Sequence, residues 1–400
     1  MLIPSRLGGL GMHQGRLVFA QLMDGFPRHP FNQIVKDWRG ENRVRRFSCM
    51  DQFLVMAFAQ LTGRESLRDI ESCLRSLDRK LYHAGFRASV ARNTLATANA
   101  KRPWQIWQEL AAVLIERARK LYANEPLQVD LENTLYALDS TTIDLCRTLF
   151  PWARFRQTKA AVKMHVLLDL RGNLPTTVYI THGKFHDVRI LDRLPFEPGA
   201  IYIFDRAFVD FKRLFRMHKS GAFFVTRAKK NFECRWLCSM PSDGQAQVHS
   251  DQIVGLKVYK SRKEFPDRLR RIHYVVPDTG KHLTFLTNQF ELPALTIAAL
   301  YKQRWQVEIF FKWIKQNLRI KSFFGTSENA VKSQLWMAIS VYVMVAILKK
   351  ELQLKPSLYT ILQVLSLNLF EKTPILEMLA DPHLILESNP NCEQLTLFDL

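Results

Sequence analysis

The chain has 400 residues, of which 57 are Lys or Arg and 37 are Asp or Glu, so its formal net charge is +20 at pH 7. A hydrophobic share of 47% excludes a disordered chain, and the length suits two or three domains with a large core. The positive charge favours a polyanionic partner, most commonly nucleic acid, although a merely basic globular protein has the same composition.

The first part of the chain, residues 13–121, is predicted to be helical. Amphipathic runs such as MDQFLVMAFAQL and WQIWQELAAVLIERARKLY alternate with short polar or Gly/Pro breaks. Two helices joined at Thr62 and Gly63 would form an arrangement like a helix-turn-helix, although most such pairs only pack. We therefore expect residues 1–125 to form a helical DNA-binding domain.

The pattern changes near residue 127 to a mixed α/β one. Strands are predicted within TLYALDSTTIDLC, KAAVKMHVLLDL, LPTTVYITHG and AIYIFDRAF, with a hairpin around Asp169 to Asn173. A β-rich insertion is expected at about 230–285, followed by a long helix from Pro293 and further helices to about 380. The apolar run at 335–348 is predicted to be a buried helix, because it is too short to span a bilayer comfortably.

Two acids follow predicted strands directly. Asp139 comes after TLYAL and Asp205 after AIYIF, and a carboxylate held at the end of a buried strand suits a metal ligand. Such an Asp can equally cap a turn or the next helix. Strand position alone does not select this pair, because other acids lie nearby in the chain: Asp130, Asp144, Asp169, Asp187 and Asp210.

A third acid stands in the predicted helix at 293–319. On a helix of 3.6 residues per turn, one arc of about 80° collects the polar side chains of this segment: Tyr301, Arg304, Glu308, Lys312 and Lys315. The rest of the helix is mostly apolar, so Glu308 needs a partner or a metal ion. The alternative is a solvated stripe of i,i+4 ion pairs.

The spacing Y-x2-R-x3-E-x6-K of Tyr301, Arg304, Glu308 and Lys315 resembles the signature of insertion-sequence DDE transposases. LDSTTIDL, FDRAF and LTNQ resemble the same family, over roughly residues 130–350. Ala207 departs from it, because many relatives have an acid there. The resemblance implies a ribonuclease-H-like catalytic domain at 126–350, with a mixed sheet and a β insertion. An all-α domain would precede it, and C-terminal helices with an acidic tail would follow at 351–400.

The resemblance also implies a chemistry. Asp139, Asp205 and Glu308 would hold two Mg²⁺ ions, with Mn²⁺ as a substitute, for phosphodiester hydrolysis and strand transfer. Tyr301, Arg304, Lys312 and Lys315 would contact DNA, although Lys312 fits a solvent-facing position as well. The expected function is cut-and-paste transposition by a homodimer on double-stranded DNA. A ribonuclease-H-like nuclease or resolvase, or an inactive domesticated DNA-binding protein, is the alternative.

The end of the chain, QLTLFDL, resembles the QLxLF peptide that docks on the bacterial sliding clamp. Gln394, Leu395, Leu397 and Phe398 would make that contact, unless they only pack. Six cysteines without CxxC spacing fit a reducing compartment. With no signal peptide in sight, we expect the bacterial cytoplasm, at the nucleoid, and no membrane association; Met12 is an alternative start.

Overall fold

The computed structural model describes residues 15–380, apart from Ala88, Gln128, Asp130, 157–158, 242–245 and 318–322. The predicted tail peptide and Met12 lie outside the described residues. The chain divides into a helical unit, made of Met1–Ala123, Cys146–Trp152 and Lys312–Glu393, and a sheet unit, made of Asn124–Leu145 and Ala153–Phe311. Each unit is built from segments that are separated in the chain. The three consecutive functional domains expected from the sequence, at 1–125, 126–350 and 351–400, stay a prediction.

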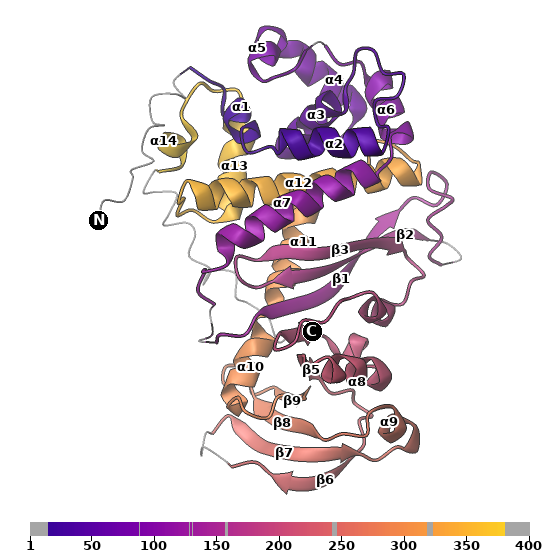
Figure 1. Cartoon of the computed structure of the whole chain (residues 1–400), viewed down its shortest axis with the longest axis vertical. Coiled ribbons are helices and arrows are strands. Elements are labelled where there is room, and N and C mark those ends of the chain that lie inside the picture. The colour runs from indigo at the N-terminus through magenta and orange to yellow at the C-terminus, as the bar shows by residue number, and fades with distance from the viewer. Residues whose placement is uncertain are drawn as a thin grey trace. The chain divides into compact units, whose positions relative to one another are not determined.

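The helical unit confirms the helices expected in the first part of the chain and after residue 327 (Figure 1). Its first group comprises α1 Val18–Met23, α2 Arg28–Asp37, α3 Cys49–Leu61, α4 Leu67–Ser76, α5 Asp78–His83, α6 Arg92–Lys101 and α7 Gln105–Tyr122. The second comprises α12 Glu328–Glu351, α13 Leu358–Asn368 and α14 Ile375–Leu379. Helices from both ends of the chain therefore share one compact unit.

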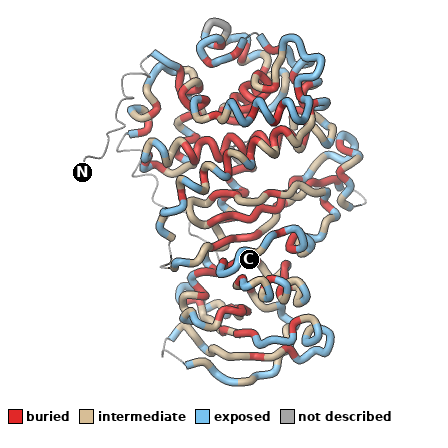
Figure 2. The backbone as a smooth tube through the Cα atoms, in the orientation of Figure 1, coloured by how far each residue is buried: buried red, intermediate tan, exposed pale blue. Residues whose placement is uncertain are grey.

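The longest helix, α12, forms the core of this unit. It packs against α7, α6 and α3, and nearly all of its residues from Ala330 to Ile347 are buried (Figure 2). The apolar segment is longer than predicted, and by length and composition alone α12 could cross a membrane. Because 89% of its most apolar window is buried inside the molecule, it has the burial of a core helix, as expected.

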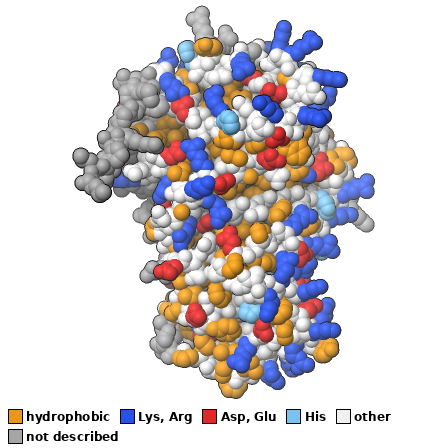
Figure 3. All heavy atoms as spheres, viewed as in Figure 1, with side chains coloured by type: hydrophobic (Ala, Val, Ile, Leu, Met, Phe, Trp, Pro, Cys, Tyr) orange, Lys and Arg blue, Asp and Glu red, His pale blue; other side chains and the backbone are white. Residues whose placement is uncertain are grey.

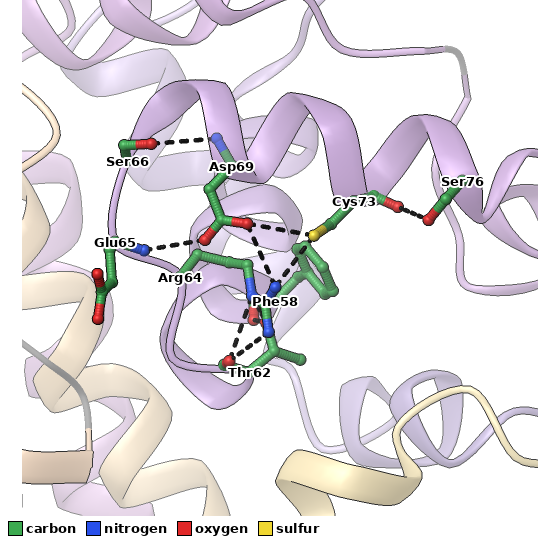
Figure 4. Close-up of polar contacts among 8 residues, drawn as sticks. All are labelled: Phe58, Thr62, Arg64, Glu65, Ser66, Asp69, Cys73 and Ser76. Atoms are coloured by element: carbon green, nitrogen blue, oxygen red, sulfur yellow. Dashed lines mark hydrogen bonds and ion pairs between the residues drawn. The ribbon is translucent and has the colours of Figure 1, made fainter.

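Helices α3 and α4 are joined at Thr62 and Gly63, as predicted, through a tightly bonded turn (Figure 4). Gly63 has φ +64°, a conformation that glycine adopts without strain. Arg64 lies across the turn and contacts the carboxylate of Asp69 at 3.3 Å and the sulfur of Cys73 at 3.0 Å. Asp69 also accepts from the backbone N–H of Glu65. These contacts tie the turn to α4.

The sheet unit contains every strand of the protein's described part. They are β1 Leu135–Leu145, β2 Ala160–Asp169, β3 Leu174–His182, β4 Ile201–Phe204, β5 Phe223–Arg227, β6 Cys234–Ser239, β7 Val248–Leu256, β8 Leu269–Val275 and β9 His282–Thr287. Short helices come between them: η1 Asp187–Asp192, η2 Arg206–Phe208, α8 Phe211–Lys219 and α9 Tyr259–Glu264. The predicted hairpin is confirmed between β2 and β3, where Gly172 and Asn173 have positive φ.

All nine strands join one mixed sheet in the order β3-β2-β1-β4-β5-β9-β8-β7-β6. β1, β4 and β5 are parallel, while β2 and β3 form an antiparallel hairpin on one side. The predicted β insertion is present as β6 to β9, which extend the sheet from β5 rather than forming a separate one. The mixed α/β class is confirmed.

Each face of this sheet carries its own buried cluster. Tyr136, Leu138, Tyr202, Phe204 and Phe224 belong to one cluster. The alternate residues on the same strands, together with α10, form the other: Leu135, Ile201, Ile203, Val225, Phe285, Ile297 and Tyr301. Because side chains alternate along a strand, odd-numbered residues of β1, β4 and β5 face α10.

The single long helix expected from Pro293 is wrong. The chain forms α10 Ala294–Lys302 and α11 Trp305–Asn317, separated by a turn at Gln303 and Arg304. Through the turn, the N–H groups of Gln303, Arg304, Gln306 and Val307 bond three residues back instead of four. Such tightening often marks a functional segment of a helix. No Pro or Gly stands at the break, so the sequence carries no signal for it.

Candidate active site

Asp139 and Asp205 lie side by side on the sheet face that α10 covers. In the parallel register of β1 and β4, Leu138 pairs with Phe204, so the next residue on each strand is an Asp. Adjacent strands are about 4.8 Å apart, and both residues share the parity of the cluster that faces α10. The two acids selected from the sequence therefore share one edge of the parallel part of the sheet.

The expectation that Asp139 ends its strand is wrong. β1 continues to Leu145, because its second half stays paired with β2, with Asp139 opposite Val166. Only the ladder to β4 stops at Leu138. Asp205 does follow its strand directly, and its side chain makes no capping hydrogen bond to η2. A capping role therefore does not explain Asp205.

Most competing acids have local partners. Asp210 caps α8 through the N–H of Arg213, and Asp169 accepts from the N–H of Arg171 in the hairpin turn. Asp187 bonds the ammonium group of Lys163 at 3.1 Å. Asp144 is exposed, and Asp130 is outside the described residues. The structure thus gives Asp169, Asp187 and Asp210 structural contacts.

Arg304, in the turn between α10 and α11, links two of the predicted acids. Its Nη1 lies 3.0 Å from Oδ2 of Asp139, and its Nη2 lies 2.6 Å from Oε1 of Glu308. Only 17% of its side chain is exposed. The ion pair therefore ties Glu308 of α11 to Asp139 of the sheet.

Tyr301, on the last turn of α10, stands between the other members of the group. Its hydroxyl is 3.5 Å from Oδ1 of Asp205, at the outer limit of a hydrogen bond. Its ring packs on Phe285 with a centroid distance of 5.0 Å, and the guanidinium of Arg304 lies 5.8 Å from its centroid. Tyr301, Arg304 and Glu308 thus meet the two aspartates although the predicted helix is broken.

Burial is the main influence on the pKa values of this group. Burial raises the pKa of Asp139 to about 6, with Glu308 and Asp205 adding to the rise and Arg304 opposing it. Burial also raises the pKa of Tyr301, which Arg304 and then Arg227 counteract. A positive charge beside Asp139 therefore favours its ionised form, as Arg304 does.

A divalent metal ion is one way to supply that charge. Within the described ranges, no three His, Cys, Asp or Glu side chains converge closely enough to hold a metal ion. The positive charge that lies between Asp139 and Glu308 is instead the guanidinium of Arg304. The donors are all carboxylate oxygens, the ligands that Mg²⁺ prefers, so their chemistry fits a hard divalent cation.

The two predicted lysines follow Glu308 on the same helix. Lys312 is exposed and Lys315 is half-buried, and both make contacts within the molecule. The boundary between the two units falls within α11, after Phe311, so Glu308 belongs to the sheet unit and the two lysines to the helical unit. Their role as DNA contacts stays a prediction.

A charged residue that the sequence did not single out lies at the same sheet edge. Arg227 ends β5, next to Asp205, because Phe204 pairs with Thr226 in the parallel register of β4 and β5. The only signal in the sequence is a basic residue at the end of a third strand, FFVTR. That signal is too common to select it without the register.

Comparison with known proteins shows what the chain resembles. Residues 131–344, more than half of the chain, match the family described as "Transposase DDE domain". The chain belongs to this DDE transposase family. Residues 14–87 match a second family, described as "Domain of unknown function (DUF4372)".

Two relatives support the assignment. A protein of Sinorhizobium fredii (strain NBRC 101917 / NGR234), named as transposase y4zB, is 34% identical over 65% of this chain and 72% of its own length. A Geobacillus stearothermophilus protein, named as a transposase for insertion sequence element IS5377, is 32% identical over 63% of this chain and 66% of its own. Among solved structures, a piggyBac transposase synaptic complex with hairpin DNA aligns at 12% identity. Its TM-score is 0.46, with 99% of this chain and 88% of that chain covered.

Proposed function

We propose that this DDE-family protein is a cut-and-paste DNA transposase. It binds the terminal inverted repeats of its element, cleaves the ends and joins them to target DNA. The observation that carries the proposal is the register of β1 and β4, which sets Asp139 beside Asp205, together with the ion pairs that hold Glu308 to the same group. A mixed sheet in which an antiparallel hairpin flanks three parallel strands supports a ribonuclease-H-like core.

Asp139, Asp205 and Glu308 would hold the metal ions. Two Mg²⁺ ions, or Mn²⁺ in their place, supply activation of the attacking oxygen and stabilisation of the leaving oxygen when bound. The sheet holds Asp139 and Asp205 at a separation that the ladder hydrogen bonds determine. Arg304 orients Glu308 toward Asp139 and offsets their repulsion. No nucleophilic side chain is needed, because water or a DNA 3′-hydroxyl attacks phosphorus directly.

Tyr301, Arg304, Lys312 and Lys315 are the proposed DNA contacts at this site. Arg304 must release a carboxylate before it can bind a phosphate through both nitrogens. The domain at 1–125, with its α3–turn–α4 pair, is proposed to bind double-stranded DNA at the element ends. Lys and Arg side chains are spread over the visible face of both units (Figure 3), which supports contact with a polyanion.

The partners are proposed from the reaction and the tail sequence. Because two element ends must be cut and joined together, we propose that a homodimer supplies two active sites. Gln394, Leu395, Leu397 and Phe398 are proposed to dock on the bacterial sliding clamp. The tail would then bring the protein to replicating DNA.

The test uses the purified full-length chain and a labelled duplex that carries the inverted repeat flanking its gene. With Mg²⁺, we expect cleavage at the repeat end, no cleavage with EDTA, and recovery when Mg²⁺ is restored. Asp139→Asn, Asp205→Asn and Glu308→Gln should each reduce cleavage below detection, because each substitution removes one anionic ligand and preserves the shape of the side chain.

Asp144→Asn is the matched control, since Asp144 is an exposed acid on the same strand as Asp139. It should cleave at the wild-type rate. Cleavage by the Asp205→Asn variant would contradict the site, as would a wild-type reaction that proceeds in EDTA. Cleavage of the duplex without joining to target DNA would favour a nuclease over a transposase.

A further inference from the structure

Arg227 lies in line with the two aspartates of the candidate site. β1, β4 and β5 are neighbouring parallel strands, and the residues that follow the pairs Leu138–Phe204 and Phe204–Thr226 are Asp139, Asp205 and Arg227. One strand spacing of about 4.8 Å separates each residue from the next. The row therefore reads acid, acid, base along one edge of the parallel sheet.

The side chain of Arg227 is on the same face as the acids. Val225 belongs to the cluster beneath α10, and Arg227 has its parity on β5. In the ladder with β9, Arg227 is directly opposite Phe285, whose ring contacts the ring of Tyr301. Directly opposed residues have Cβ atoms about 5 Å apart. Arg227 is thus placed beside Tyr301, and its charge acts on the Tyr301 hydroxyl.

The guanidinium of Arg227 is uncommitted, unlike the other cations nearby. Within the described part of the chain it makes no hydrogen bond or ion pair, and the residue is half-buried. Arg304 forms ion pairs through Nη1 with Asp139 and through Nη2 with Glu308. Lys229 donates to the carbonyl of Val209. Among these three side chains, Arg227 is the one with none of its donors engaged in the described part of the chain.

We propose that Arg227 is a further DNA contact at the candidate site and binds a phosphate oxygen of the DNA strand without first having to release a carboxylate, as Arg304 must. This inference rests on the proposed function. A planar guanidinium suits a phosphate, because two parallel N–H groups can reach two oxygens. Its position next to Asp205 places that phosphate at the carboxylate group, where the reaction has to occur.

The test compares Arg227→Gln and Arg227→Lys with wild type in the full-length chain. Affinity for the element-end duplex is measured without divalent cations over a range of salt concentrations, and cleavage is measured in Mg²⁺ under single-turnover conditions. Arg227→Gln should lower the slope of log K against log salt by about one and slow cleavage roughly ten- to hundredfold. Arg227→Lys should keep the slope and still slow cleavage, since it keeps the charge and loses the two-pronged contact.

Arg268→Gln is the matched control. Arg268 is exposed and comes just before β8. Arg227 pairs with Phe285 of β9, which pairs in turn with Ile272 of β8, so Arg268 is four residues away from the level of Arg227. That offset is about 13 Å along the strand. The inference is overturned if Arg227→Gln matches Arg268→Gln in both slope and rate. An inactive wild type would instead refute the proposed function, and the binding slope would still decide the role of Arg227.

Discussion

Replacing Arg304 with Gln tests whether this side chain holds the site together. Gln keeps part of the length and the hydrogen-bonding capacity but removes the charge that faces Asp139 and Glu308. At an effective dielectric constant of about 20, one ion pair at 4 Å contributes about 4 kcal/mol before desolvation is counted. Arg304 makes two such pairs, at 3.0 and 2.6 Å.

The net effect is smaller than the sum of the two attractions. Removing one partner of a buried ion pair costs about 3–5 kcal/mol, because the remaining charge stays buried without compensation. The side chains of Arg304, Asp139 and Glu308 are 17%, 18% and 29% exposed, so solvent screens part of their charge. We therefore expect Arg304→Gln to lower the free energy of unfolding of the sheet unit by about 3 kcal/mol at neutral pH.

The decrease in the free energy of unfolding is measured by urea denaturation, with hydrogen exchange of the β1 and β4 amides as the readout for the sheet unit. Arg268→Gln, an exposed arginine of the same unit, should change the free energy of unfolding by no more than about 0.5 kcal/mol. In the double variant Asp139→Asn with Arg304→Gln, the loss should be smaller than the sum by about 1–3 kcal/mol. An Arg304→Gln protein as stable as wild type, or strictly additive losses, would refute the positioning role.

Two further predictions concern other parts of the chain. Burial lowers the pKa of His165 to about 4. The nearby Asp187 opposes this shift, whereas the positive charges of Lys163 and Arg193 add to it. The unfolded chain then takes up a proton below pH 6.5 while the folded one does not, so stability should fall by about 3 kcal/mol between pH 6.5 and 4. His165→Gln should remove that part of the pH dependence in denaturation curves, and an unchanged slope would contradict it. In the tail, Leu397→Ala with Phe398→Ala should abolish pull-down of the sliding clamp and leave end cleavage intact; equal capture by both proteins would rule out the docking peptide.

Local sequence patterns determined the elements of this protein and most members of its site. Runs of β-forming residues between turn residues predicted β1 to β4, and the turn residues Gly172 and Asn173 predicted the β2–β3 hairpin. Asp139 and Asp205 could be named as candidates because an acid directly after a run of β-forming residues is a local feature, and the resemblance of LDSTTIDL and FDRAF to the family selected them from the other acids. The spacing of Tyr301, Arg304 and Glu308 is equally local. The sequence signature therefore identified these residues correctly as a group, although the single predicted helix is two helices, α10 and α11.

Tertiary structure decided how these parts meet, because pairing between distant strands leaves no mark on either strand alone. The register of β4 with β5 brings Arg227 to the aspartates, and nothing near Arg227 in the sequence announces it. The second half of β1 stays ordered past Asp139 because β2 pairs with it there. The chain turns at Gln303 and Arg304 without a helix-breaking residue, and in that turn the Arg304 guanidinium bridges Asp139 and Glu308. The sequence determined which elements carry the candidate acids, whereas long-range packing decided which charged side chains pair with them.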